Sequence, residues 1–329
     1  MPPGVSESNL ASTIDQVLSP VFLGHLGRMR LSVRRAFGPR PGETPVRGLV
    51  QASGLELERH KPYDAGDELR FLDWNAYARL DQLLVRQFRA EREAPVHVFI
   101  DGSASMGSPA EDGKFDFAVG LALSLAYVAV RHHNPVRIVC LQDPLTRTPP
   151  ADGGDSRSQN PFHGGHYIAS TVVRFPALMH RLAEFCAALR PGGTTVLDSG
   201  LAAYMQSHAV PGMAVVISDF LIESGTPALL HELAARGYEA TVLRPLGPGE
   251  RDPSRLFQRA RVRDSETGRE KIVRLTAENL RRYQSALAEH LQDLERDCAD
   301  NEALFAACDV TGGLEHCLFS QLPQVGLLR

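Results

Sequence analysis

The sequence lacks the features by which several classes of protein are recognised. Its five cysteines form an odd set without a Cys-x-x-Cys pair, which argues against a disulfide framework and against a zinc knuckle. We therefore expect reduced, mostly buried thiols. The formal net charge of -4 gives no bulk attraction to nucleic acid, so a nucleic-acid partner is not expected.

No apolar run is long enough to suggest a membrane span. The longest, FAVGLALSLAYVAV at residues 117–130, is shorter than the ~20 residues that such a helix needs, and it predicts a buried core helix. The N-terminal sequence MPPGVSESNLASTIDQ lacks the basic start and apolar block of a secretory signal. We expect a cytoplasmic protein without a membrane span.

What the sequence does contain is enough apolar material for a substantial core, since 43% of its 329 residues are hydrophobic. The patterns divide it into residues 1–93, 94–246 and 247–329. The first stretch is expected to begin with a helix at residues 14–37. After a Pro/Gly-rich connector, it continues as a platform rich in Arg, Asp and aromatic residues, at residues 59–92, that packs on the main domain.

The middle stretch, residues 94–246, predicts the main domain. Strand-like segments PVHVFID, VRIVCLQ, MAVVISDF and YEATVLRP alternate with helical segments, the later ones near residues 176–189, 196–208 and 227–236. Such alternation indicates an α/β fold with a doubly wound, mostly parallel sheet of the Rossmann type, covered on both faces. A polar insertion at residues 143–165 is expected to be mobile.

The last stretch, residues 247–329, predicts a C-terminal extension. RVRDSETGREKIVRL has the pattern of a hairpin in which Gly268 can take a left-handed turn position. A long helix follows, capped by Thr276. Its apolar stripe should pack on the body of the protein, and it consists of Leu280, Tyr283, Leu287, Leu291, Leu294 and Cys298.

Oxygen-bearing side chains follow two of the predicted strands and precede one predicted helix. The stretch VFIDGSASMGS comes at the end of the first strand of the main domain, VVISDF ends a later strand, and RPGGTTVLDSG leads into a helix. Ligands of open parallel sheets bind beyond the carboxyl ends of the strands. We therefore expect these loops to converge there, carrying Asp101, Ser103, Ser105, Thr194, Thr195, Ser218 and Asp219.

This set of side chains suits a hard divalent cation. Two carboxylates and three hydroxyls are ligands of the kind that Mg²⁺ prefers, and the absence of histidine and cysteine from the set disfavours zinc. The sequence therefore predicts a site for Mg²⁺, or another divalent cation, formed by Asp101, Ser103, Ser105, Asp219 and one of the two adjacent threonines.

The joint order of these motifs resembles the metal-ion-dependent adhesion site of von Willebrand factor A domains. Upstream, RHKPYDAGDELRFLDWNAYARLDQLLVRQFRAERE leading into DGSASM resembles the family called domain of unknown function 58, as do RDSETGREKIVRL and YQSALAEHLQDLERDC further on. The resemblance covers most of the chain from about residue 28. It favours Thr194 over Thr195 as the metal ligand, and it places Ser218-Asp219-Phe220 where many A domains have Thr-Asp-Gly.

The resemblance implies a binding module and not an enzyme. In A domains the serines and the threonine bind the ion directly or through water, the aspartates often act through water, and an acidic residue of a partner protein fills the remaining position. For this family we expect the partner to be a MoxR-type AAA+ ATPase or its client, in chaperone-like assembly or maturation of client proteins.

Other interpretations of these motifs remain open. Asp-x-Ser-x-Ser alone is most often an Asx-type turn that caps the next segment. A Mg-dependent phosphohydrolase of the haloacid dehalogenase type also has an aspartate after its first strand. That chemistry commonly needs a second acid two residues later, where this chain has Ser103, and a lysine that neither GGTT nor SDF provides.

Two further motifs have both a structural and a functional interpretation. Asp73-Trp74 either packs as a capped turn or anchors the platform with help from Arg70 and Arg79. The histidines of HGGH, at positions 163 and 166, have no third metal ligand nearby in the sequence and are expected to be solvated.

Overall fold

The computed structural model describes residues 7–34, 55–64, 72–90, 93–143, 162–164, 166–208, 210–222, 225–253, 259–274 and 276–329. Two compact units result, one from residues 1–35 and 94–329 and the other from residues 36–93. The candidate functional residues all lie in the larger unit.

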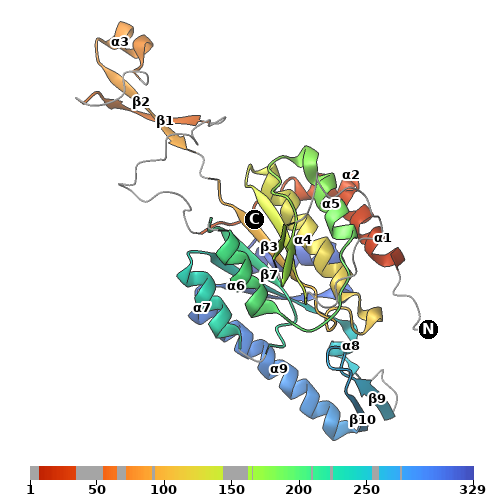
Figure 1. The fold of residues 1–329 in the computed structure, drawn as a ribbon. Helices are drawn as coiled ribbons and strands as arrows, with labels where there is room; N and C mark the ends of the chain where they lie inside the picture. Colours follow the sequence, from red (N-terminus) through yellow and green to blue (C-terminus); the bar gives the residue numbers. More distant parts are fainter. Residues whose placement is uncertain are drawn as a thin grey trace. The chain divides into compact units, whose positions relative to one another are not determined.

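The larger unit is built on a seven-stranded, mostly parallel sheet with strand order β11-β8-β7-β3-β4-β6-β5. Its central strands β3 and β7 are labelled in Figure 1. The strands from β11 to β4 are parallel, and β6 and β5 continue the sheet antiparallel. The predicted α/β class with a mostly parallel sheet is confirmed. Its strands are β3 (Val96–Asp101), β4 (Val136–Leu141), β5 (Phe162–Gly164), β6 (Tyr167–Ala169), β7 (Met213–Ile217), β8 (Glu239–Leu246) and β11 (Leu304–Asp309).

Helices cover both faces of this sheet. Alternate residues of β3 point to opposite sides, so Val98 and Ile100 belong to one hydrophobic core and Phe99 to the other. The five cysteines are buried and free, as predicted. The first core is covered by α1 (Glu7–Leu18), α2 (Pro20–Leu26), α4 (Lys114–Arg131), α5 (Met179–Ala187), α10 (Gly313–His316) and α11 (Leu322–Gln324), and the second by α6 (Leu197–Ser207), α7 (Thr226–Ala235) and α9 (Ala277–Asp300).

The predicted apolar core helix is α4. The stretch Ala110–Arg131 is long and apolar enough to cross a membrane by composition alone, yet 83% of its most apolar window is buried inside the protein. Apolar side chains on all sides are what a helix enclosed by a sheet and other helices requires. The burial of α4 therefore agrees with the interpretation as a core helix.

The bounds predicted for the N-terminal helix, residues 14–37, are wrong. Ser19 accepts a hydrogen bond from Phe22 N and caps α2, whose first residue is Pro20, so the chain breaks between α1 and α2. After α2 it becomes extended, because Leu31 forms a β-bridge with Leu328 near the C-terminus. The N-terminal helices pack in the first core and so belong to the larger unit.

The C-terminal stretch contains the predicted hairpin and capped helix, and also a strand that the sequence did not predict. β9 (Arg259–Arg263) pairs antiparallel with β10 (Glu270–Arg274), and Gly268 has a φ of 70° in the turn. Thr276 Oγ1 accepts a hydrogen bond from Asn279 N at the start of α9. Of the apolar stripe of α9, Leu294 and Cys298 are buried. The unpredicted strand, β11, is an edge strand of the sheet.

The polar insertion expected at residues 143–165 lies outside the described residues, except for Asp143 and Phe162–Gly164. The latter form β5, which pairs with β6 at the edge of the sheet. The side chain of His163 also lies outside the described part, and that of His166 is half-buried.

The smaller unit contains the described part of the platform. β1 (Leu55–Pro62) and β2 (Leu84–Ala90) form an antiparallel pair, and α3 (Trp74–Leu80) begins after Asp73, which accepts hydrogen bonds from Asn75 N and Ala76 N. Trp74 is 63% exposed within the described residues and makes an edge contact with Tyr77. Arg70 lies outside the described residues. That the platform packs on the main domain stays a prediction.

Gly212 allows β7 to approach the start of β3, and its replacement is expected to reduce stability. A Cβ atom at this position would lie 2.0 Å from the backbone oxygen of Pro95, which accepts a hydrogen bond from Met213 N at 2.8 Å. Because the obstacle is backbone, we expect Gly212→Ala to lower the free energy of unfolding by about 1–3 kcal/mol. The control is Gly24→Ala, where no atom of the described residues lies within 4 Å of the new Cβ. Urea unfolding measures both, and equal stabilities would contradict the close approach.

Candidate functional site

The candidate site lies where loops meet beside β3, the strand at which the chain order in the sheet reverses. β3 is flanked by β4 on one side and by β7 on the other. The Asp-x-Ser-x-Ser loop follows β3, and its Gly102 N donates to Leu141 O at the end of β4 at 2.7 Å. Such a switch point in an open parallel sheet is the usual place for a ligand.

Backbone hydrogen bonds hold the Gly-Gly-Thr-Thr loop against the Asp-x-Ser-x-Ser loop. Gly192 N donates to Gly102 O at 2.8 Å, and Ala104 N donates to Gly193 O at 3.0 Å. The two loops are almost ninety residues apart in the chain. The Gly-Gly-Thr-Thr loop connects α5 to α6, so it is these backbone bonds that bring it to the end of β3, where the sequence analysis expects it.

Asp101 is the centre of a buried hydrogen-bonded group. Its Oδ1 accepts from Ser103 N at 2.9 Å, which is an Asx-type turn, and its Oδ2 accepts from Ser218 Oγ at 2.6 Å. The Oγ atoms of Ser103 and Ser105 lie 2.9 Å apart. Asp101, Ser103 and Ser105 are thus brought together directly, and the turn interpretation describes part of what Asp101 does.

Asp219 adds a second buried carboxylate to this region. Its Oδ1 accepts from Leu221 N at 3.2 Å, whereas its Oδ2 is buried and has no hydrogen-bond partner among the described residues. Burial, and then the negative charge of Asp219, raise the pKa of Asp101 from 3.8 to about 6, although hydrogen bonds from Ser218 and Ser103 oppose the shift. The two carboxylates therefore repel each other while their residues are almost fully buried, Asp101 at 1% and Asp219 at 0% exposure.

Two buried carboxylates with an unpartnered oxygen fit a divalent cation. Burying unpaired charge is costly, and a bound cation relieves that cost. Within the described part of the chain, no three His, Cys, Asp or Glu side chains gather into a metal-binding group. The fit therefore depends on the combination of Asp101 and Asp219 with the hydroxyls of Ser103 and Ser105, all of them oxygen ligands.

The threonines face carboxylates of other loops. Thr194 Oγ1 donates to Asp143 Oδ2 at 3.1 Å, and Thr195 donates to Glu266 through both its backbone N (3.1 Å) and its Oγ1 (2.6 Å). Thr194 is therefore carried next to the Asp-x-Ser-x-Ser loop by its backbone, while its hydroxyl makes a different contact. Thr194 Oγ1 is not hydrogen-bonded to Asp101, Ser103, Ser105 or Asp219, the four other predicted ligands.

Some polar residues at this edge were not among the predicted ligands. Ser218 holds Asp101 and also accepts from Phe220 N at 3.0 Å. Arg244 Nε donates to Asp219 O at 3.2 Å from the neighbouring strand β8. Asp143 follows β4, so its position at a strand end was a usable signal, whereas nothing in the sequence places Glu266, in the distant β9–β10 hairpin, at this loop.

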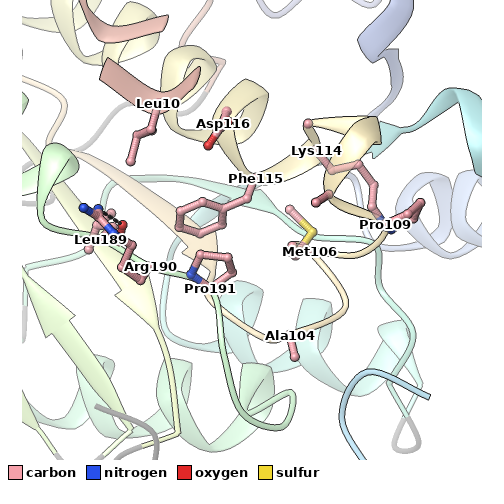
Figure 2. Close-up of a pocket in the computed structure, with 13 residues that line it drawn as sticks. Leu10, Ala104, Met106, Pro109, Lys114, Phe115, Asp116, Leu189, Arg190 and Pro191 are labelled. Atoms are coloured by element: carbon pink, nitrogen blue, oxygen red, sulfur yellow. Dashed lines mark hydrogen bonds between the residues drawn. The ribbon is translucent and has the colours of Figure 1, made fainter. Parts of the chain in front are cut away.

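A small pocket lies against the Asp-x-Ser-x-Ser loop, on the side of α4 and the segment before the glycine pair (Figure 2). Its volume is about 160 Å³. Met106, Phe115 and Pro191 line it, and Arg190 at its rim donates to the carbonyl of Leu189 at 2.7 Å. None of the predicted metal ligands lines this pocket, so it is separate from the carboxylate pair.

The family model described as "Protein of unknown function DUF58" matches residues 59–293, more than half of the 329 residues. The uncharacterized protein Mb1516 of Mycobacterium bovis and the uncharacterized protein Rv1480 of Mycobacterium tuberculosis are each 28% identical to the chain over 203 residues. These matches cover 61% of this chain and 58% of each relative, so the chain spans little more than half of their length.

Among solved structures, the chain is similar to the conserved hypothetical protein BatB from Bacteroides thetaiotaomicron. The identity is 14%, the coverage is 70% of this chain and 98% of that one, and the TM-score is 0.38. It is also similar to an aerotolerance-related membrane protein from Bacteroides fragilis. Here the identity is 17%, the coverage is 70% of this chain and 99% of that one, and the TM-score is 0.34. Similarity at this level carries no functional assignment.

Proposed function

The chain belongs to the DUF58 family, and from the geometry of its site we propose that it is a metal-dependent protein-binding adaptor built on a von Willebrand factor A-like domain. One observation carries the proposal. Asp101 and Asp219 are both buried, they repel each other, and Asp219 Oδ2 has no hydrogen-bond partner among the described residues, beside serine hydroxyls at the switch point of the sheet.

The residues that would hold the ion are Asp101, Ser103, Ser105, Thr194 and Asp219. When bound, Mg²⁺ or another divalent cation would neutralise the carboxylates and offer a ligand position to an anionic side chain. Asp101 fixes the first loop through Ser103 N and Ser218 Oγ. Phe220, with a φ of 54°, and the Arg244 bond to Asp219 O fix the turn after β7.

The partner that we propose is a MoxR-type AAA+ ATPase or its client, which would present an Asp or Glu to this face. Family resemblance supports the class of partner, and the charge balance supports the acidic residue. Two carboxylates of the site neutralise one divalent charge without enclosing the ion in anionic ligands, so a third carboxylate can bind in place of water. Metal dependence of the interaction follows.

The alternative, a phosphohydrolase of the haloacid dehalogenase type, has less support from the contacts. Residue 103 is a serine whose backbone N–H binds Asp101, and Lys114, the next lysine along the chain, is 2% exposed with its Nζ 2.6 Å from Glu250. It is therefore engaged away from any phosphoryl group. Hydrolysis of generic phosphoesters that is abolished by Asp101→Asn would favour the enzyme over the adaptor.

Magnesium titration of the whole chain by calorimetry tests the proposed site. Ser103→Ala removes a hydroxyl next to Asp101 while the backbone bond to Asp101 remains, so we expect Mg²⁺ affinity to fall about tenfold or more. Ser207→Ala, whose exposed hydroxyl donates to Ala203 O within α6, is the matched control and should bind as the wild type does. Binding of a purified MoxR-type ATPase should follow the same order and be lost in EDTA. Unchanged Mg²⁺ affinity in Ser103→Ala would refute the site.

A further inference from the structure

A carboxylate of this chain already occupies the Gly-Gly-Thr-Thr loop. Both the backbone N and the Oγ1 of Thr195 donate to the two carboxylate oxygens of Glu266, at 3.1 and 2.6 Å, across 71 residues of sequence. Bonds from donors to an ionised acceptor are stronger than neutral ones. Thr195 therefore holds both oxygens of this carboxylate through two hydrogen bonds.

The turn that carries Glu266 is organised to present it. Glu266 lies at the tip of the β9–β10 hairpin, where Asp264 Oδ1 accepts from Glu266 N at 2.9 Å and Asp264 Oδ2 accepts from Thr267 Oγ1 at 2.6 Å. Gly268 takes the left-handed conformation, and its N donates to Asp264 O at 2.9 Å. The side chain of Asp264 is thus used within the turn, and that of Glu266 is left to project to Thr195.

The loop that Glu266 binds is the one that supplies Thr194 to the proposed metal site. Ala104, between Ser103 and Ser105, is bonded to Gly193 of this loop at 3.0 Å. An acidic residue of a partner that approaches the ion must come to the same loop. A carboxylate of the chain is already held at this loop by Thr195, the residue next to Thr194.

We propose that Glu266 is a built-in competitor for the partner's acidic residue, and that the partner presents this residue on a polar turn like Asp264-Ser265-Glu266-Thr267-Gly268. The inference rests on the proposed function. Because the hairpin belongs to the same chain, its effective concentration at the loop is on the order of millimolar. A free segment must displace it, which lowers the apparent affinity until Glu266 is released.

The probe for this proposal is a fluorescein-labelled cyclic peptide with the sequence of residues 263–269, RDSETGR. Its binding to the whole chain is measured by anisotropy in Mg²⁺ and in EDTA. In Mg²⁺ we expect Glu266→Ala to bind the peptide about tenfold or more tightly than the wild type. Glu266→Gln keeps the shape of the side chain and should change affinity in the same direction. A peptide carrying Glu266→Gln should not bind.

The control variant is Glu270→Gln, which removes an exposed charge from β10 of the same hairpin and should leave peptide affinity as in the wild type. Equal affinity of the wild type and Glu266→Ala in Mg²⁺ would show that Glu266 only anchors the hairpin, and would overturn the proposal. Calorimetry with Mg²⁺ alone tests the proposed metal site separately from the proposed role of Glu266. Metal binding with indifferent peptide affinity refutes only the competitor, whereas absence of metal binding refutes the proposed function and the competitor together.

Discussion

In EDTA at pH 8, Asp219→Asn is expected to be more stable than the wild type, which is unusual for a change at a buried polar residue. The asparagine can keep the bond from Leu221 N through its oxygen, and it removes the charge that opposes ionisation of Asp101. The rise of the Asp101 pKa from 3.8 to about 6 corresponds to about 3 kcal/mol of destabilisation, mostly from burial. We expect the variant to recover about 1 kcal/mol of this.

The sign of the pH dependence follows from the raised pKa of Asp101. Above about pH 6 the folded protein holds Asp101 ionised against both burial and Asp219, so the full destabilisation is present. As the pH falls from about 6 toward 3.8, the folded state binds the proton first and the destabilisation disappears. The advantage of Asp219→Asn in EDTA should therefore be largest above pH 6 and vanish in acid.

Magnesium should reverse the order of the two proteins. At a Mg²⁺ concentration of about 100 times its dissociation constant, a protein that binds the ion only when folded gains about 2.7 kcal/mol. The wild type should gain this amount and Asp219→Asn almost none, so the wild type becomes the more stable. Urea unfolding with and without Mg²⁺ measures both differences.

Asp293→Asn is the matched control for this reversal. It removes a carboxylate charge that is 62% exposed on α9. It should change the free energy of unfolding by no more than a few tenths of a kcal/mol, both in Mg²⁺ and in EDTA. If Asp219→Asn gains as much from Mg²⁺ as the wild type does, the ion binds elsewhere. If it is less stable in EDTA, the repulsion between Asp101 and Asp219 is not what governs this site.

The sequence predicted those parts of the site that follow from the alternation of strands and helices and from the parallel sheet that this alternation implies. Alternating strands and helices place the ends of β3 and β7 at one edge, so the convergence of Asp101, Ser103, Ser105 and Asp219 needed only the parallel sheet. Side-chain partners across loops do not follow from such patterns. The bond of Thr194 to Asp143, and that of Thr195 to Glu266, depend on loop conformations that no short motif encodes.

The misjudged elements have a common physical cause. The segment after α2 is basic and helix-compatible, but pairing of Arg30 N with Arg329 O and binding of Arg34 to Glu239 hold it extended. β11 has the short sequence LFAACD, which has only a weak preference for a strand by itself. It forms a strand because it pairs with β8 at the edge of the sheet. In both places contacts with distant parts of the chain outweigh local propensity.

A buried ionic network joins the site to the start of α4 and to α8 (Pro248–Arg251). Glu250 lies between Lys114 Nζ, 2.6 Å from its Oε1, and Arg244 NH1, 3.6 Å from its Oε2. The side chains of both cations are 2% exposed. Arg244 also donates to Asp219 O. Glu250 is therefore hydrogen-bonded to the buried Lys114 and lies close to the buried Arg244 without a hydrogen bond to it, and Arg244 supports the turn that carries Asp219.

Glu250→Gln is expected to lower the free energy of unfolding by about 3–5 kcal/mol, because it leaves Lys114 and Arg244 buried without their carboxylate. Glu232→Gln is the control, since its pair with Arg236 is 36% and 40% exposed and should be worth less than about 1 kcal/mol. Urea unfolding gives both values. Adding Lys114→Met to Glu250→Gln should return part of the loss, because the methionine removes a buried cation that has no partner left. A double variant that is no more stable than Glu250→Gln would mean that Lys114 reaches water once Glu250 is gone, and the network would then be a surface pair in solution.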